Sequence, residues 1–99
     1  MNIKKIKSEE KTTFSLSGTL DMVTAPKLQE VLIPEFERVK HVELDFKNLS
    51  YVASAGLRVL VTGEKTAKTK GCKQIIVNVP NRVMEVFKMT GFLNILSIE

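Results

Sequence analysis

Residues 42–46, Val-Glu-Leu-Asp-Phe, alternate without exception between apolar and acidic side chains. This period of two is typical of a β-strand that buries one face and turns the other toward water. A strand covered by helices on both faces would be apolar throughout. We therefore expect a sheet whose helices lie mainly on one face.

A helical pattern precedes this strand. Apolar side chains recur at helical spacing over residues 24–38, with Thr24 as the expected N-cap and Pro26 in the first turn. Pro34 falls inside the pattern, where it lacks the N–H and clashes with the preceding turn. We therefore predict a helix over 24–38 that is kinked at Pro34.

A second helical pattern follows the strand. After a predicted loop over residues 48–53, residues 54–70 place apolar side chains on one side, and Gly71 ends the helix. The opposite side is polar, with Arg58 and Thr62 close together at 100° per residue. We expect this polar side to face solvent or a partner.

The rest of the chain follows the same rules. Residues 3–7 and 12–20 predict two strands joined by a short polar turn, hence an antiparallel hairpin. Residues 74–79 form a nearly continuous apolar run, which predicts a more central strand. A third helix opens at residues 80–81 and ends at Gly91, and residues 95–98 predict a last short strand.

The predicted order is therefore β-β-α-β-α-β-α-β. Strand–helix–strand units favour right-handed crossovers between parallel strands. The expected fold is a small α/β domain: a mostly parallel, mixed sheet of about five strands, with an N-terminal antiparallel edge and helices mainly on one face. No linker or repeat divides the sequence, so residues 1–99 are expected to form a single domain.

Composition sets the class of protein. The chain has 99 residues, of which 43% are hydrophobic and 26% charged, as in ordinary globular domains. No apolar run is long enough for a transmembrane helix, and the charged N-terminus has no apolar segment behind it, as a signal peptide would. The single cysteine, Cys72, cannot form a disulfide within the chain. We expect a cytoplasmic protein with no membrane association.

The net charge of +4 lies entirely in the second half of the chain, since residues 1–50 carry eight basic and eight acidic side chains. The bases between Arg58 and Lys73 are spread through a helical pattern. A solvated helix face explains them best, and an acidic protein partner is the alternative. Direct nucleic-acid binding is the least favoured interpretation, because aromatic residues are few and Trp is absent.

The residues offer little for catalysis. His41 is the only histidine and is expected in a structural role at the surface, while Cys72 is expected as a small apolar filler. The two Gly-rich phosphate-binding motifs, G-x-G-x-x-G and G-x-x-x-x-G-K-[ST], are both absent from the sequence. The carboxylates show no metal-ligand spacing. We predict a binding protein that is not an enzyme and that uses no cofactor or metal.

Ser54 opens the second predicted helix, between the small residues Ala53, Ala55 and Gly56. A serine there is expected as an N-cap, contributing about 1 kcal/mol. The same position suits a phosphate, because a helix N-terminus offers free N–H groups and a positive dipole. The small neighbours leave the hydroxyl reachable by another protein's active site. The sequence alone leaves both interpretations open.

Three segments, taken in order, resemble the STAS domain family of sulfate transporters and anti-sigma-factor antagonists. Ser17-Gly18-Thr19-Leu20-Asp21 resembles the strand end before the family's first helix. Residues 44–60, from Leu-Asp-Phe through Ala-Ser-Ala-Gly-Leu, resemble its central strand, switch loop and second helix. Residues 83–92 are similar to its last helix and turn. The match spans nearly the whole chain and implies a stand-alone anti-sigma factor antagonist.

The resemblance implies a partner switch. In the family, the unphosphorylated antagonist binds an anti-sigma factor that is also a serine kinase, with an ATP-binding, histidine-kinase-like fold, and the sigma factor is freed for transcription. The kinase phosphorylates a serine at the position of Ser54, the complex separates, and a serine phosphatase resets it. The implied partner surface comprises Asp21, Thr24, Ala53, Ser54, Ala55, Gly56, Arg58 and Thr62. The free protein is expected to be a monomer.

Two features leave alternatives open. Many family members carry an acidic residue directly before the serine, whereas this chain has Ala53. The second hypothesis is therefore a STAS-like scaffold, or a regulator of a non-sigma partner, without phosphorylation. Asp21 has two interpretations, a contact for the partner or a turn carboxylate that accepts backbone N–H groups. A third class, weak nucleotide binding, lacks any phosphate loop in the sequence.

Overall fold

The chain forms four strands and three α-helices in the computed structural model, which describes residues 1–99. Their bounds are β1 (Asn2–Lys7), β2 (Lys11–Leu20), α1 (Ala25–Glu35), β3 (His41–Val52), α2 (Ser54–Thr69), β4 (Lys73–Val77) and α3 (Asn81–Thr90), followed by the short 3₁₀ helix η1 (Phe92–Asn94). No helix is both long and apolar enough to cross a membrane.

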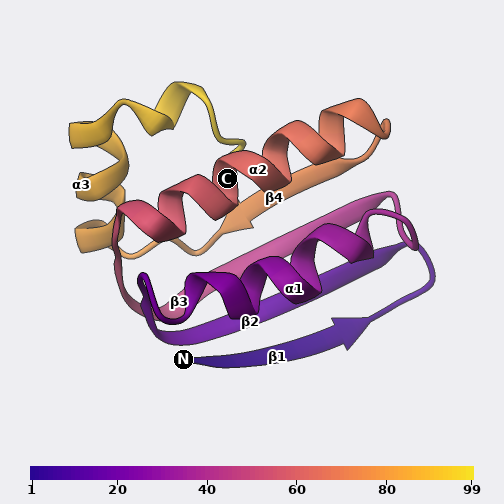
Figure 1. Ribbon diagram of the computed structural model, residues 1–99, viewed down its shortest axis with the longest axis horizontal. Coiled ribbons are helices and arrows are strands. Elements are labelled where there is room, and N and C mark those ends of the chain that lie inside the picture. The colour runs from indigo at the N-terminus through magenta and orange to yellow at the C-terminus, as the bar shows by residue number, and fades with distance from the viewer.

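The strands form one mixed sheet in the order β1-β2-β3-β4. β1 pairs with β2 in an antiparallel hairpin, whereas β2–β3 and β3–β4 are parallel. Helices α1 and α2 run side by side over the same face of the sheet (Figure 1). The predicted α/β fold with an antiparallel N-terminal edge is confirmed.

Alternation along β3 separates the two faces of the sheet. Val42, Leu44 and Phe46 are fully buried beneath the helices, while Glu43 and Asp45 on the other face remain partly exposed. Burial of such apolar side chains contributes about 1.5–3 kcal/mol each, and this term holds the helices on that face.

Three expectations about the strands are corrected. Residues 48–52, predicted as a loop, belong to β3, which pairs with β2 as far as Val52. β4, predicted to be more central, lies at the edge of the sheet. The expected fifth strand over 95–98 is reduced to a single parallel bridge between Ile76 and Ile98.

The C-terminal tail, residues 97–99, explains why an edge strand is so apolar. The Ile76 N–H donates to the Ser97 carbonyl, and the Glu99 N–H donates to the Ile76 carbonyl, both at 2.9 Å. The buried carboxylate of Glu64 on α2 accepts the Ser97 N–H at 3.2 Å and its hydroxyl at 3.0 Å. The tail thus covers the edge that a further strand would otherwise occupy.

The first helix, α1, is shorter than its predicted range of residues 24–38. Helix α1 ends at Glu35, one residue after the proline. The chain continues in a tighter turn in which Glu37 N–H donates to Pro34 O at 3.1 Å and Arg38 N–H to Glu35 O at 2.9 Å. This turn sets Glu35 and Arg38 on the side that faces β1.

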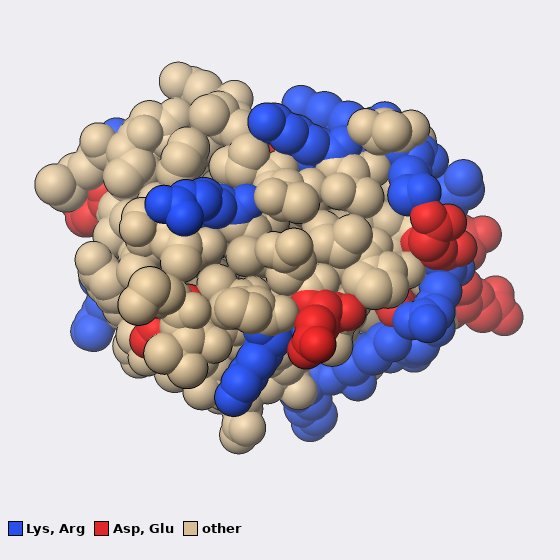
Figure 2. All heavy atoms as spheres, in the orientation of Figure 1, with Lys and Arg blue, Asp and Glu red and all other residues tan.

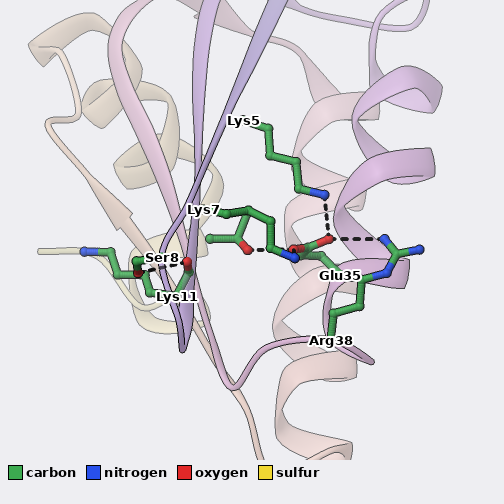
Figure 3. Close-up of polar contacts among 7 residues, drawn as sticks. Lys5, Lys7, Ser8, Lys11, Glu35 and Arg38 are labelled. Atoms are coloured by element: carbon green, nitrogen blue, oxygen red, sulfur yellow. Dashed lines mark hydrogen bonds and ion pairs between the residues drawn. The ribbon is translucent and has the colours of Figure 1, made fainter.

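A buried carboxylate fastens the end of α1 to the hairpin. Glu35 has no exposed surface, and it accepts a hydrogen bond from the Thr12 hydroxyl at 2.6 Å. Lys5 Nζ lies at 3.0 Å, Arg38 Nη1 at 3.3 Å and Lys7 Nζ at 3.7 Å from its oxygens (Figure 3). We call this group the Glu35 cluster.

The Glu35 cluster controls the protonation of its carboxylate. Burial raises the pKa of Glu35. Hydrogen bonds from Thr12, Lys5 and Arg38, together with the Lys5 charge, lower it by more than burial raises it, so the pKa falls from 4.5 to about 2. Glu35 is therefore ionised at every physiological pH and the cluster remains complete.

Candidate functional site

The parallel pairing of β2 and β3 brings two chain segments together at one end of the sheet. The Ala53 N–H donates to the Leu20 carbonyl at 2.8 Å, and Leu20 pairs with Val52. The β2–α1 loop, residues 21–24, therefore lies beside the start of α2 (Figure 1). Ligand and partner sites of α/β proteins commonly form at such carboxyl ends of strands.

Asp21 and Thr24 close the β2–α1 loop with reciprocal hydrogen bonds. The Asp21 carboxylate accepts the N–H groups of Val23 and Thr24 at 3.0 Å each. The Asp21 N–H donates to the Thr24 hydroxyl oxygen at 2.8 Å, and that hydroxyl donates to Thr19 O at 2.8 Å. This arrangement is a capping box, displaced by one turn toward the N-terminus.

The capping box assigns roles to both residues. Thr24 directly precedes α1 as predicted, but its side chain makes no cap hydrogen bond to the helix, and the capping oxygen belongs to Asp21. The hydrogen bond that the Thr24 N–H donates to the Asp21 carboxylate is the main reason why the pKa of Asp21 lies below its ordinary value. The turn interpretation of Asp21 therefore accounts for its observed contacts.

Ser54 is the first residue of α2 and is exposed. The N-cap is Ala53, in extended conformation, so the expectation that Ser54 caps the helix is wrong. Neither residue makes a side-chain cap hydrogen bond, and no acidic residue lies in the first turn. The first N–H groups of α2 thus keep their positive potential uncompensated, next to a hydroxyl with no partner in the chain.

Gly56 fixes how closely α2 approaches the end of β2. A Cβ atom at this position would lie 2.6 Å from Leu20 Cγ and 3.0 Å from the Leu20 carbonyl oxygen. Leu20 is fully buried and has no room to move aside. A side chain at residue 56 would therefore force the start of α2 and the end of β2 to shift relative to each other.

A groove of about 700 Å³ runs between α1 and α2. Only two charged side chains line it, Glu30 on the α1 wall and Arg58 on the α2 wall. The other lining residues are Met22, Ala25, Pro26, Gln29, Ile33, Pro34, Ala55 and Val59. The centre of this face carries few charges, whereas Lys, Arg, Asp and Glu gather at the end opposite the start of α2 (Figure 2).

The predicted partner residues occupy different positions around this groove. Ala55 and Arg58 line the groove, Thr62 is exposed one turn further along α2, and Ser54 with Asp21 lies at the end of the groove. Thr24 and Gly56 are buried, so their contribution is to position the loop and α2. Ala53 supplies the backbone link to Leu20.

Two exposed apolar residues were not predicted from the sequence. Met22 is 78% exposed and Val23 70% exposed, both in the β2–α1 loop beside the groove. Their position in a short loop otherwise made of polar and small residues could have indicated from the sequence that these apolar side chains are exposed. Exposed hydrophobic side chains beside a groove are typical of interaction surfaces.

The two residues considered for catalysis lie apart from this site. The half-buried thiol of Cys72 faces the carbonyl oxygens of Phe36 and Val39 at 3.5 and 3.6 Å. His41 is the first residue of β3, paired between Lys11 and Lys73. Neither side chain forms a hydrogen bond with a nucleophilic side chain or with a carboxylate that could orient it.

Comparison with known proteins identifies the family. The sequence matches the STAS domain over residues 2–99. It is 30% identical to the anti-sigma-B factor antagonist of Bacillus subtilis strain 168, covering 99% of this chain and 90% of that protein. The chain belongs to the STAS domain family, and its relatives are named for antagonism of an anti-sigma factor rather than for catalysis.

Solved structures agree on the fold. The unphosphorylated anti-sigma factor antagonist SpoIIAA aligns with a TM-score of 0.83 at 17% identity, covering 99% of this chain and 88% of that one. The phosphorylated form of the Bacillus protein SpoIIAA aligns with a TM-score of 0.77 at 16% identity, covering 99% and 91%.

Proposed function

We propose that this STAS domain is a phospho-switched anti-sigma factor antagonist that acts in the cytoplasm. With Ser54 unmodified it binds an anti-sigma factor that is also a serine kinase, with an ATP-binding, histidine-kinase-like fold, and so frees a sigma factor. Phosphorylation of Ser54 separates the complex, and a serine phosphatase restores the binding form. The protein acts as a monomer when free and does not contact nucleic acid.

One observation carries this proposal: the Ser54 hydroxyl is exposed and makes no hydrogen bond within the chain. A serine that served only to cap α2 would accept a backbone N–H. A hydroxyl that a kinase must reach has to be free of such contacts. Its position among small residues beside a partly apolar groove gives a partner access to it.

The proposed binding surface combines the Asp21 loop, residues 53–56 and the exposed side of α2 with Arg58 and Thr62. Met22 and Val23 add apolar area to it. Apolar anchors surrounded by polar side chains are the usual composition of a transient interface. The Asp21–Thr24 capping box holds the loop in one conformation, which lowers the entropy lost on binding.

A phosphate on Ser54 would leave the fold intact and act on the interface. It adds about −1.5 to −2 charge, and a helix N-terminus stabilises negative charge. The charge would instead oppose burial against a partner, because a desolvated and unpaired charge is costly. The likeness of this fold to both forms of SpoIIAA supports a switch without refolding.

The test compares Ser54→Asp and Ser54→Ala for binding to the anti-sigma factor of the same organism, by isothermal titration calorimetry. We expect Ser54→Ala to bind as the unmodified protein does and Ser54→Asp to bind at least about tenfold more weakly. Ser50→Asp, at an exposed serine on β3, is the matched control and should bind normally. Equal affinity of both Ser54 variants would remove Ser54 from the mechanism.

A second candidate function is a scaffold, or a regulator of a non-sigma partner, without phosphorylation. Ala53 as the N-cap favours it, because the start of α2 lacks the acidic side chain that many family members carry before the serine. Phosphopeptide mass spectrometry on protein from its native cells, in growth and under stress, separates the two. Occupancy that changes with condition supports the switch, and an unmodified Ser54 together with a stable homo-oligomer supports the scaffold.

A further inference from the structure

Arg58 is the one cation of the groove, and its guanidinium makes no ion pair. It is exposed and absent from all five salt bridges of the chain. The Arg58 side chain donates no hydrogen bond within the chain, and the Thr62 hydroxyl engages only the Arg58 backbone carbonyl, at 2.9 Å. Arg58 is therefore available to a new acceptor at no loss of an existing contact.

Ser54 and Arg58 are separated by four residues on α2. Residues at this spacing are neighbours on a helix surface, about 40° apart around the axis and about 5–6 Å apart at Cβ. An anion N-terminal to a cation at i, i+4 is the favourable orientation. The flexible arginine side chain reaches a phosphate at this spacing, and its planar guanidinium donates two parallel N–H groups to phosphate oxygens.

Ser54 lies outside the groove, whereas Arg58 lines it opposite Glu30. An ion pair with a phosphate on residue 54 would draw the guanidinium toward the start of α2 and away from the groove. Glu30 would then be the only charge left on the groove walls. The groove would change from one cation and one anion to an acidic surface.

We propose that phosphate on Ser54 is bound within the chain by Arg58, and that this ion pair removes the only positive charge from the α1–α2 groove. The inference rests on the proposed phosphorylation of Ser54 and specifies how that phosphate alters the surface. Phosphorylation then changes the interface in two ways at once: it adds a dianion at the edge of the interface, and it removes a cation from the groove.

The test installs phosphoserine at residue 54 during synthesis of the full chain, so that no kinase or partner is needed. The phosphate is titrated by ³¹P NMR in the otherwise unchanged chain, in Arg58→Gln and in Lys68→Gln. Lys68→Gln removes the same charge from the same helix, at a position about 15 Å beyond Arg58 and about 20 Å beyond Ser54 along the helix axis. The helix N-terminus and Asp21 act on the phosphate equally in all three proteins, so the differences isolate the removed cation.

We expect Arg58→Gln to raise the second pKa of the phosphate by roughly 0.3 of a pH unit, with a difference that shrinks in high salt. Lys68→Gln should leave that pKa unchanged. Equal pKa values in the unchanged chain and Arg58→Gln would overturn the proposal. An equal rise in both variants would also overturn it, because it would reflect net charge alone. Either failure would leave the Ser54→Asp binding test of the switch unaffected.

Discussion

The two ends of α1 each carry a carboxylate, and the two carboxylates serve opposite purposes. Glu35 at the C-terminal end is buried and holds three cations and a hydroxyl around it. Asp21 at the N-terminal end lies in a partly exposed turn and accepts the backbone N–H groups of Val23 and Thr24. One end fastens the helix to the hairpin, and the other holds the β2–α1 loop in one conformation beside the α1–α2 groove.

The comparison indicates where the molecule can change without unfolding. Polar groups of the Glu35 cluster are satisfied inside the protein, so their loss costs stability. Polar groups at the Ser54 end, the serine hydroxyl and the first N–H groups of α2, are left to solvent or a partner. Stability and contact are thus separated between the two ends of α1, because the Glu35 cluster lies at its C-terminal end and the start of α2 lies beside its N-terminal end.

The largest effect is expected from Glu35→Gln. The neutral amide keeps the size of the side chain but loses the charge-assisted hydrogen bonds, so unfolding by urea should show a loss of about 2 kcal/mol. Glu37→Gln is the control, since Glu37 forms only a surface ion pair with Lys70 and should cost less than about 0.5 kcal/mol. Similar losses for the two variants would mean that the Glu35 cluster adds nothing beyond a surface pair.

The same cluster predicts a pH dependence. The folded-state pKa of Glu35, about 2, lies below its ordinary value of 4.5, so the unfolded chain binds this proton more readily. The stabilisation is complete above about pH 4.5 and is lost as the pH falls toward 2. Urea midpoints measured stepwise over this range should fall more steeply for the unchanged protein than for Glu35→Gln. Parallel curves would contradict the lowered pKa.

In the first turn of α2, which lies beside the other end of α1, Gly56→Ala should have the next largest effect. The added methyl group meets the buried Leu20 side chain, and the strain exceeds the gain in helix propensity, for a net loss of about 1–2 kcal/mol. Combining it with Leu20→Ala should give a loss smaller than the sum of the two single losses. Additive losses would show that the two residues do not press on each other.

The smallest effects distinguish Asp21 from Ser54. Asp21→Ala removes the acceptor of two N–H groups and should cost about 1 kcal/mol. Ser54→Ala removes a hydroxyl without a partner and should change stability by less than about 0.5 kcal/mol. A loss near 1 kcal/mol for Ser54→Ala would mean that the hydroxyl caps α2 in solution.

Much of this architecture could be predicted from local patterns. The alternation at residues 42–46 correctly placed the helices on one face, and the helical pattern from Ser54 matched α2 nearly to its end. The edge position of β4 could not be predicted in this way. Its apolar character arises from the tail bonded to Ile76, a contact between segments about 20 residues apart.

The site was predicted in part, for a similar reason. Spacing identified Ser54 at the helix start, but only the three-dimensional structure shows that Ala53 takes the cap position and that Asp21 caps the preceding loop. The groove is lined by side chains from α1 and α2, and no local sequence pattern indicates that these two helices lie side by side. By residue type alone, Met22 and Val23 do not differ from the apolar residues of the core. Their exposure in the structure distinguishes them from buried side chains.

The C-terminal tail has a consequence for the solubility of the protein. An uncovered edge strand offers unpaired N–H and C=O groups to another chain and is a common start of aggregation. β4 is apolar enough for this, and the Glu64–Ser97 contact holds the tail across its edge at Ile76. Loss of that contact would expose the unpaired edge of β4 on a folded molecule, so we expect the carboxylate of Glu64 to limit association between copies as well as to hold the tail in place.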